Sequence, residues 1–429
     1  MPDRDPQDDA ALLDRLCGLK ARGRRYGLDR LRLLAPHLGH PERGLSCIHV
    51  AGTNGKGSVA AMIESILRAA GWRTGLYTSP HLVHVGERVQ VNRVPLTTAQ
   101  VADYVRFLYP LADAVAAEAG ADDRPSFFEY MTAMALLEFA RQRCDLAVIE
   151  VGLGGEFDAT NIVLPEVAVI ASIGLDHCEW LGSTLGQIAS AKAGIVKPGR
   201  PLVIGRLPAE AEAVIRARAA AVGAPVLSVR EAYGEEIAAY PHTNLLGDYQ
   251  RWNAATATLA VRTLAARWRI GDEAIVRGLG QVDWPGRWQR VRVGERSVIL
   301  DASHNPEGAA VLAANLGRLV AETGRRPIVV TGVLGAERAR PLLVAIARHA
   351  AEIHLVVPNQ PRACSHAELA ALVPADFSGR LVRTQLRDVF PRPDYCALGA
   401  AGEPVVVTGS IYLLGEVLAR LGATVPGGA

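Results

Sequence analysis

The chain has 429 residues, 49% of them hydrophobic, and its 46 basic and 44 acidic side chains leave a formal net charge of +2. A chain of this length exceeds the size at which a single hydrophobic core stops growing, so we expect two domains. The near balance of charge argues against nucleic acid as the main partner, because binding to a phosphate backbone requires a clustered basic excess. No apolar run approaches the roughly 20 residues of a membrane span.

The six cysteines are widely spaced and form no CxxC pair. This usage predicts reduced thiols in a cytosolic protein and no cysteine metal site. The acidic, polar start of the chain lacks the features of a signal or transit peptide. We therefore expect a cytoplasmic monomer that acts on small molecules, with neither nucleic acid nor membrane as a partner.

Short apolar runs alternate with longer helical patterns along the chain. The first set comprises CIHVA, a helix from Ser58, RTGLYTS, a helix before DLAVIEVG, VAVIASIG and PLVIG. Such alternation predicts an α/β fold with a mainly parallel sheet and helices on both faces. Pro285 and Gly286 break the pattern, and a second, smaller alternating set follows. We predict a larger N-terminal P-loop domain over residues 1–287, which binds ATP, and a smaller Rossmann-like C-terminal α/β domain over residues 288–429.

The segment GTNGKGS, from Gly52 to Ser58, separates the first predicted strand from a helix whose apolar residues share one face: Val59, Met62, Ile63, Ile66 and Leu67. Glycines let backbone N–H groups approach phosphate oxygens, the helix N-terminus favours an anion, Lys56 neutralises charge, and Ser58 lies near a metal. Val50 stands where the common loop GxxxxGK[ST] has its first glycine, so this is a shorter variant. A turn that merely connects two elements seldom carries Lys and Ser in this register. The segment predicts ATP binding.

Polar side chains follow further strands of the first set. Glu150 ends DLAVI, Asp176 and His177 follow VAVIASIG, and a later helix carries Lys192. Ligands of open parallel sheets bind at the carboxyl ends of the strands, so these groups are candidates for a magnesium site beside the triphosphate. Taken singly, a Glu after a strand is often a cap and a lone His is often structural. Together with the loop they predict a metal site.

In the second domain Asp301 ends the predicted strand SVILD, and His304 and Asn305-Pro306 follow. We interpret Asn305 as a helix N-cap and Pro306 as the first helical residue. Asp301, His304 and Arg287 are then expected to face a crevice between the domains, where Arg287 reaches a phosphate. An active site divided in this way predicts closure during turnover.

These motifs occur together in one order along nearly the whole chain: GTNGKGS, TSPHL (Thr78 to Leu82), ERVQVN (Glu87 to Asn92), SFFEYMT (Ser126 to Thr132), EVGLGG and DATN (Glu150 to Asn161), LDH and KAGI (Leu175 to Ile195), PGR (Pro285 to Arg287) and HNP (His304 to Pro306). In this the chain resembles the folylpolyglutamate synthase and dihydrofolate synthase family of the Mur ligase superfamily. The resemblance implies an ATP-dependent amide ligase that forms an acyl phosphate, which the amine of glutamate attacks.

The resemblance also implies roles for single residues and two Mg²⁺ ions as cofactors beside ATP. It assigns metal binding to Ser79, Glu150, His177 and a carbamylated Lys192, and catalysis to Lys56, Lys192 and His304. It assigns ATP binding to Gly52, Thr53, Asn54, Gly55, Lys56, Gly57, Ser58, Asn253, Arg287 and Asp301. Phe128 would stack on the pterin ring and Asp158 would accept its hydrogen bonds. The implied substrates are L-glutamate and dihydropteroate or tetrahydrofolate.

Three positions depart from the family pattern: Glu156 replaces a usual arginine, Ser303 a usual alanine, and Asp248 a basic or bulkier residue. A negative charge at Glu156 near the folate disfavours a polyglutamylated tail, so we expect dihydropteroate to be at least as good a substrate as a folate.

Three alternatives remain. A relative could use the same chemistry on another carboxylate. A cell-wall Mur ligase fits less well, because no domain for a uridine nucleotide precedes the loop. A catalytically silent nucleotide-binding module is disfavoured, because none of the implied catalytic groups is missing.

Overall fold

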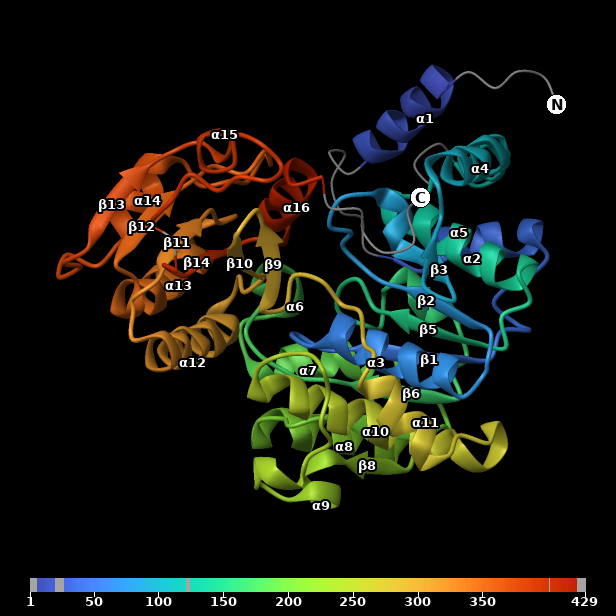
Figure 1. Ribbon diagram of the computed structural model, residues 1–429. Helices are drawn as coiled ribbons and strands as arrows, with labels where there is room; N and C mark the ends of the chain where they lie inside the picture. The colour runs from blue at the N-terminus through green and yellow to red at the C-terminus, as the bar shows by residue number, and fades with distance from the viewer. Residues whose placement is uncertain (1–5, 20–26, 121–123, 401, 423–429) are drawn as a thin grey trace. The chain divides into compact units, whose positions relative to one another are not determined.

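The computed structural model describes residues 6–19, 27–120, 124–400 and 402–422 (Figure 1). The chain forms two compact units. Among the described residues, the larger unit comprises those from 6 to 244 and from 251 to 282, and the smaller comprises those from 245 to 250 and from 283 to 422. Both are α/β units, as the alternating patterns predict.

The larger unit is built on an eight-stranded sheet in the order β4-β3-β2-β5-β1-β6-β7-β8 within the described residues. Its strands are β1 (Cys47–Ala51), β2 (Thr74–Tyr77), β3 (Val89–Val91), β4 (Val94–Pro95), β5 (Leu146–Glu150), β6 (Val167–Ile170), β7 (Leu202–Ile204) and β8 (Val226–Ser228). The two pairings that involve β3 are antiparallel and the rest are parallel. Every residue of β1, β5 and β6 is buried, which requires cover on both faces of the sheet.

Helices supply that cover. The α-helices of this unit are α1 (Pro6–Gly18), α2 (Asp29–Leu34), α3 (Lys56–Ala69), α4 (Thr98–Ala119), α5 (Phe127–Arg141), α6 (Cys178–Leu181), α7 (Leu185–Ala193), α8 (Ala209–Ala221), α9 (Val229–Tyr233), α10 (Asp248–Trp268) and α11 (Asp272–Leu279). Short 3-10 helices are η2 (Ala35–Leu38), η3 (Val85–Arg88), η5 (Ala159–Ile162) and η6 (Ile237–Ala239). The first residues of α10 group with the smaller unit.

The core of the larger unit forms where helices pack on the central strands. On α3 the five apolar residues predicted to share one face are all fully buried. Cys47 of β1 joins a cluster that includes Met131 and Phe139 of α5. Burial of these side chains fixes the central strands, so the loops that leave their carboxyl ends have firm starting points.

The smaller unit has a six-stranded sheet in the order β13-β12-β11-β14-β10-β9 within the described residues. The strands are β9 (Gln289–Val293), β10 (Arg296–Asp301), β11 (Ile328–Thr331), β12 (Glu352–Leu355), β13 (Arg380–Arg383) and β14 (Val405–Thr408). The helices are α12 (Pro306–Thr323), α13 (Ala336–His349), α14 (His366–Leu372), α15 (Leu386–Val389) and α16 (Ile411–Arg420). Only the β9–β10 pair is antiparallel in this described sheet.

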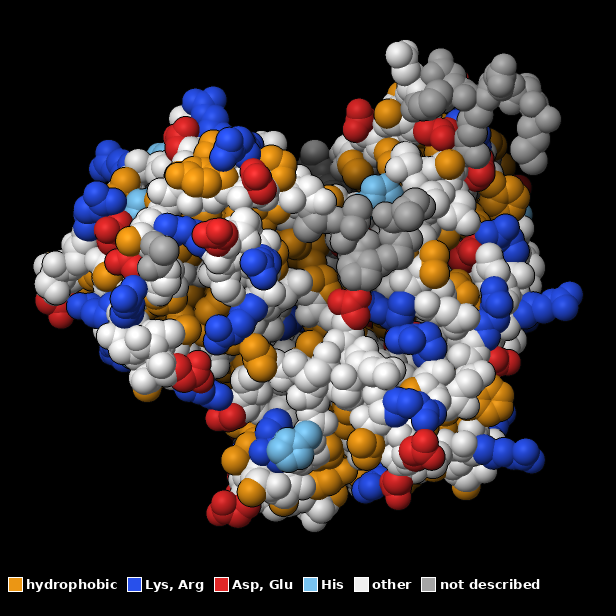
Figure 2. All heavy atoms as spheres, in the orientation of Figure 1, with side chains coloured by type: hydrophobic (Ala, Val, Ile, Leu, Met, Phe, Trp, Pro, Cys, Tyr) orange, Lys and Arg blue, Asp and Glu red, His pale blue; other side chains and the backbone are white. Residues whose placement is uncertain are grey.

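The surface mixes charges of both signs. Basic and acidic side chains are interspersed over the face seen in Figure 2, in keeping with the small net charge. Among the described residues, no helix is both long enough and apolar enough to cross a membrane. All six cysteines carry free thiols, and three of them, Cys47, Cys364 and Cys396, are buried.

Candidate functional site

The phosphate loop joins the carboxyl end of β1 to the start of α3. Gly52 and Gly55 have φ angles of 151° and 78°, which L side chains rarely adopt. A Cβ on Gly52 would also lie 3.1 Å from the Ser172 backbone nitrogen. Because Gly55 takes the N-cap position in the left-handed conformation, the helix begins at Lys56, two residues before the predicted start at Ser58. Strand, loop and helix are otherwise as predicted.

Two lysines meet at this loop. Lys56 Nζ donates to the carbonyls of Gly52 and Thr53 at 3.1 Å each, and Lys192 Nζ donates to the same Gly52 carbonyl at 2.8 Å. Lys192 comes from α7 and is 5% exposed. Its burial lowers its pKa to about 7, and the charge of Lys56 acts in the same direction. The loop therefore has beside it a buried amine, that of Lys192, which titrates near neutrality.

A segment after β6 holds the loop in place, and the sequence did not predict it. The Ser172 hydroxyl accepts from the Asn54 N–H and donates to the Asn54 carbonyl, both at 2.9 Å. The Ser172 carbonyl accepts from the Thr53 N–H at 2.8 Å, and the Thr53 hydroxyl bonds the Gly174 backbone. β6 pairs directly with β1, so a polar residue just past β6 lies beside the loop. The pairing of β6 with β1 therefore identifies Ser172 as a residue that contacts the loop, and this pairing is known only from the folded structure.

The same segment corrects the predicted position of Asp176 and His177. β6 ends at Ile170, so the two residues do not end the strand but follow a loop. His177 has φ 52°, a left-handed conformation uncommon for a residue with a side chain, and its N–H donates to Asp176 Oδ1 at 2.9 Å. A backbone of this kind, held by its neighbours, is typical of functional turns.

Ser79 and Glu150 come together because β2 pairs with β5. Tyr77 lies in register with Ile149, so the segment after β2 passes the end of β5. The Ser79 N–H donates to Glu150 Oε2 at 3.0 Å, and Glu150 is 4% exposed. Two of the predicted metal ligands are therefore neighbours.

Glu87 fixes the segment that follows Ser79. Its buried carboxylate accepts three consecutive backbone N–H groups, from Leu82, Val83 and His84, at 2.7, 2.9 and 2.6 Å. Charge-assisted hydrogen bonds of this kind are the stronger ones in proteins. Sequence reasoning used Glu87 only as part of a motif and gave it no role, since nothing local indicates which N–H groups it meets.

The residues present fit a divalent cation. Ser58 Oγ is buried on the phosphate loop and has no hydrogen-bond partner. Buried polar atoms are normally satisfied, so this oxygen could bind a cation or accept a hydrogen bond from a ligand. Within the described ranges no three His, Cys, Asp or Glu side chains group as metal ligands. The predicted metal ligands are not such a group, because only Glu150 and His177 are of these residue types and the other two are a serine and a lysine.

The two predicted pterin residues meet at one glycine-rich turn, residues 152–158, which contains Asp158 and contacts Phe128 of α5. A Cβ on Gly152 would lie 2.4 Å from Phe128 Cζ, so the half-buried Phe128 ring packs against this turn. Asp158, almost fully buried, accepts the Leu153 N–H on Oδ2 at 2.9 Å and the Thr160 N–H on Oδ1 at 3.0 Å. An aromatic ring and a carboxylate therefore lie at the same turn. Glu156, in between, is exposed.

Asn253 on α10 lies against the loop, since a Cβ on Gly55 would be 2.4 Å from Asn253 Oδ1. The role of Asn253 in ATP binding stays a prediction.

In the smaller unit the predicted residues form a local arrangement. Asp301 ends β10, is 2% exposed, and accepts N–H groups of Trp288 and Ser303 at 3.1 Å each. His304 Nδ1 lies 2.8 Å from the Ala302 carbonyl, which only accepts, so Nδ1 carries a proton. Neutral His304 then has its lone pair on Nε2. The Arg287 guanidinium bonds the Gly286 carbonyl at 3.2 Å.

The interpretation of Asn305-Pro306 as a helix start is confirmed. Asn305 Oδ1 accepts the Gly308 N–H at 2.9 Å, and Pro306 is the first residue of α12. The turn from Asp301 to Asn305 is therefore shaped by hydrogen bonds between residues close in sequence.

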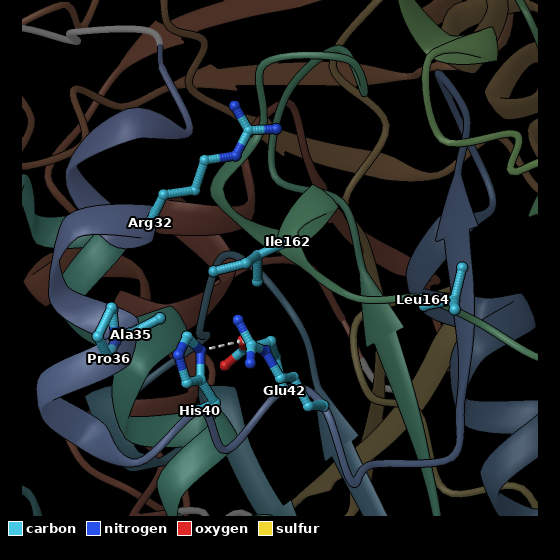
Figure 3. A pocket seen from close by; sticks show the side chains of 8 residues that line it. Arg32, Ala35, Pro36, His40, Glu42, Ile162 and Leu164 are labelled. Atoms are coloured by element: carbon cyan, nitrogen blue, oxygen red, sulfur yellow. Dashed lines mark hydrogen bonds and ion pairs between the residues drawn. The ribbon is translucent and has the colours of Figure 1, made fainter.

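A cavity of about 600 Å³ lies elsewhere in the larger unit (Figure 3). It is lined by Arg32, Ala35, Pro36, His40, Glu42, Arg43, Ile162 and Leu164. None of these is a predicted site residue, and His40 hydrogen-bonds the neighbouring Glu42 at 2.9 Å in its lining. The hydrogen bonds at the carboxyl ends of β1, β5 and β6, rather than cavity size, locate the candidate site.

Known proteins share this organisation. The Mur ligase middle domain matches residues 50–239, and the Mur ligase, glutamate ligase domain matches residues 286–410. The dihydrofolate synthase/folylpolyglutamate synthase of Bacillus subtilis is 36% identical over 423 residues, which cover 93% of this chain and 96% of the relative.

Solved structures agree. Folylpolyglutamate synthase of Mycobacterium tuberculosis, complexed with ADP and AMPPCP, matches with a TM-score of 0.83 and 31% identity over 97% of this chain and 99% of that one. A bifunctional folylpolyglutamate synthase/dihydrofolate synthase with Mn, AMPPNP and L-glutamate bound matches with a TM-score of 0.78 and 31% identity, over 96% and 98% of the two chains. With both domain matches, a relative of nearly full length and a phosphate loop of the expected geometry, the chain belongs to the folylpolyglutamate synthase/dihydrofolate synthase family of ATP-dependent, glutamate-adding ligases.

Proposed function

We propose that this protein joins L-glutamate to the carboxylate of dihydropteroate, and of folates, in two steps. A carboxylate oxygen attacks the γ-phosphorus of ATP, the bond to the β-phosphate oxygen breaks, and ADP leaves. The glutamate amine then attacks the acyl carbon, an amide forms, and inorganic phosphate departs with the loss of a proton. The phosphate loop, with Lys56 bonded to its Gly52 and Thr53 carbonyls at the start of α3, supports this best, because a lysine and a helix N-terminus stabilise the charge of a phosphoryl group in transfer.

The nucleotide is assigned to the phosphate loop, Gly52 to Ser58, with Asn253 on the adenine side. Lys56, already directed at the loop, is positioned to replace its carbonyl contacts by phosphate oxygens. In the smaller unit we assign Arg287 to the phosphates, Asp301 to the ribose or a nearby phosphate, and His304 to the transferred group. When neutral, His304 has its lone pair on Nε2, which suits it to take a proton from the glutamate ammonium before the resulting amine attacks.

Magnesium would be held by Ser79, Glu150 and His177, with Ser58 close by and a second ion near Lys192. When bound, the metal offsets the charge of the phosphoryl oxygens. Glu150 and Ser79 are already oriented toward one another by the hydrogen bond between them. The structure of the bifunctional relative with Mn and AMPPNP supports a divalent cation beside the nucleotide.

Lys192 is proposed to become a carbamate. A pKa of about 7 leaves much of this amine neutral in the cell, and only a neutral amine attacks CO₂. The nitrogen bonds the CO₂ carbon, a proton leaves, and an anionic carbamate replaces a cation. The change turns an amine that repels a second metal ion into an oxygen ligand for one.

The pterin ring is assigned to Phe128 and Asp158. The half-buried face of Phe128 offers a stacking surface. Asp158 Oδ1 already accepts two hydrogen bonds from Thr160 and Oδ2 accepts one from Leu153, so we assign the ring N–H donors to Oδ2. Burial raises the pKa of Asp158, while its hydrogen bonds to Thr160 and Leu153 favour the charged form.

One assay tests the proposal. The protein is incubated with ATP, Mg²⁺, L-glutamate and either dihydropteroate or tetrahydrofolate, and the products are weighed by mass spectrometry. We expect one glutamate on dihydropteroate, at a rate no lower than that with tetrahydrofolate, because exposed Glu156 disfavours an anionic tail. Much faster extension of a folyl diglutamate would contradict the preference, and no glutamylation of any pterin acid would contradict the function.

A further inference from the structure

A line of three buried polar side chains runs from the middle of the large sheet to Asp158. His49 on β1 is fully buried, and its Nε2 lies 2.8 Å from Thr160 Oγ1. Thr160, also fully buried in η5, has its hydroxyl 2.5 Å from Asp158 Oδ1. Histidine is rare at the centre of a parallel sheet, where apolar residues fill both faces. Its presence calls for an account that core packing does not give.

The chemistry of the three groups sets the direction of these hydrogen bonds. An ionised carboxylate only accepts, so the single hydroxyl proton of Thr160 points to Asp158. Thr160 Oγ1 then serves as the acceptor for His49, which must carry its proton on Nε2. The order is His49 Nε2–H to Thr160 Oγ1–H to Asp158 Oδ1. If Asp158 were protonated on Oδ1, each hydrogen bond would have to reverse.

His49 is suited to hold this one direction. Burial lowers its pKa to about 3, so it stays neutral and carries one ring proton. Its other nitrogen, Nδ1, is buried without a partner, which costs free energy that an apolar residue would not. The hydrogen bond of Nε2 to Thr160 is the interaction that offsets this cost.

We propose that His49 and Thr160 are positioning residues that keep the Asp158 carboxylate ionised and oriented, and thereby select substrates whose ring edge presents N–H donors. This rests on the proposed contact of Asp158 with the pterin. Oδ1 accepts both the N–H and the hydroxyl of Thr160, whereas Oδ2 accepts only the Leu153 N–H among these bonds, so Oδ2 is the oxygen assigned to the ligand and a ring edge that presents a lone pair to it is rejected. Lys192 on α7 and Tyr77 on β2 also interact electrostatically with Asp158, and neither bonds Oδ1.

Thr160→Val tests this line, with Thr160→Ser as the matched control that restores the hydroxyl. In Thr160→Val we expect the KM for dihydropteroate to rise about tenfold, as for the loss of a hydrogen bond to a charged group, with kcat and the KM for ATP unchanged. Thr160→Ser should behave as the wild type. Equal KM values for dihydropteroate in the Val and Ser variants would overturn the proposal, because the hydroxyl would then have no effect on substrate binding. A parallel loss of kcat would indicate a merely structural role.

A spectroscopic measurement without substrate tests the hydrogen-bonded line from His49 through Thr160 to Asp158, here called the relay. In the ¹⁵N spectrum of the labelled wild-type chain, we expect His49 to remain neutral with the proton on Nε2 from pH 5 to pH 8. The signal should change in Thr160→Val and be restored in Thr160→Ser. A His49 found with its proton on Nδ1, or charged in this range, would overturn the proposal even if Thr160→Val failed to fold.

Asp158→Asn separates this inference from the function on which it rests. If that variant kept the wild-type KM for dihydropteroate, the contact between Asp158 and the pterin would be wrong and the selection role of His49 and Thr160 would fall with it. The ¹⁵N spectrum would still decide whether the relay exists. If Asp158→Asn raised that KM while Thr160→Val did not, the contact would stand and the relay would be refuted.

Discussion

The two units present functional side chains in different ways. In the larger unit the phosphate loop is held by residues far away in sequence: Ser172 and Lys192 lie 118 and 140 positions from the groups that they bond. In the smaller unit Asp301, His304 and Asn305 are arranged by partners no more than 13 positions away. The site in the larger unit therefore exists only once the whole sheet has formed, whereas the turn in the smaller unit is largely encoded in its own segment.

Replacement of Lys192 should have the largest effect. We expect Lys192→Ala to lower kcat by about 10²–10³-fold, the range for removal of one preorganised charge-stabilising group, while ATP still binds. Ligation is measured by product mass and ATP binding by calorimetry. Lys192→Arg keeps the charge but cannot react with CO₂, so it should be equally inactive.

An active Lys192→Arg would disprove the carbamate. The modification is also open to direct detection, because the chain has only four lysines, Lys20, Lys56, Lys192 and Lys197. With ¹³C-labelled bicarbonate we expect one labelled carbamate, absent from Lys192→Ala.

The Ser172 contact should come next in size. Ser172→Ala leaves the Asn54 N–H without its side-chain acceptor, so the loop loses a fixed shape. Since one hydrogen bond contributes about 1 kcal/mol, we expect the KM for ATP to rise roughly five- to tenfold. Exposed Ser190 on α7 gives the control, and Ser190→Ala should change nothing. An unchanged KM in Ser172→Ala would mean that distant contacts do not shape the loop.

The buried amine of Lys192 should also make stability depend on pH. Its pKa is about 7 in the folded chain, against an ordinary value of 10.5, so between these values the unfolded chain binds the proton and the folded chain does not. Stability must then rise with pH across this window, and below the window this group gives it no pH dependence, because both states hold the proton. In CO₂-free buffer, urea unfolding of the wild type relative to Lys192→Met should show this rise. Parallel curves for the two proteins would place the pKa of Lys192 at its ordinary value.

The smallest effect should belong to the local turn. Asn305→Ala removes the N-cap of α12 and should cost about 1 kcal/mol of unfolding free energy, with kcat/KM near the wild-type value. Ser365→Ala, at the N-cap of α14 in the same unit, is the matched control and should cost a similar amount. A larger loss of kcat/KM in Asn305→Ala than in Ser172→Ala would reverse the comparison between the units.

The same contrast explains what could be predicted from the sequence. Periodicity identified β1, β5, β10 and the buried face of α3, because each is a local pattern of apolar residues. It placed the end of β6 too late, since Ala171 and Ile173 are apolar and buried yet lie in a loop. Hydrophobicity reports burial, and burial at the end of a strand does not require a strand.

Side-chain partners across the sheet were beyond reach. The positions of Ser79 beside Glu150 and of Ser172 beside Asn54 depend on which strands pair, and strand order is not written in any one segment. The αL conformation of Gly55 likewise moved the helix start. Asn305-Pro306, whose partners are its own neighbours, was read correctly.

The Gly52 carbonyl, shared by Lys56 and Lys192, makes nucleotide binding and the protonation of a buried amine parts of one equilibrium. Phosphate anions at the loop favour the cationic form of Lys192, and couplings between two bound species are reciprocal. We therefore expect nucleotide binding to be accompanied by proton uptake near neutral pH. It follows that, while Lys192 is not carbamylated, the affinity of the loop for ATP depends on pH and increases on acidification.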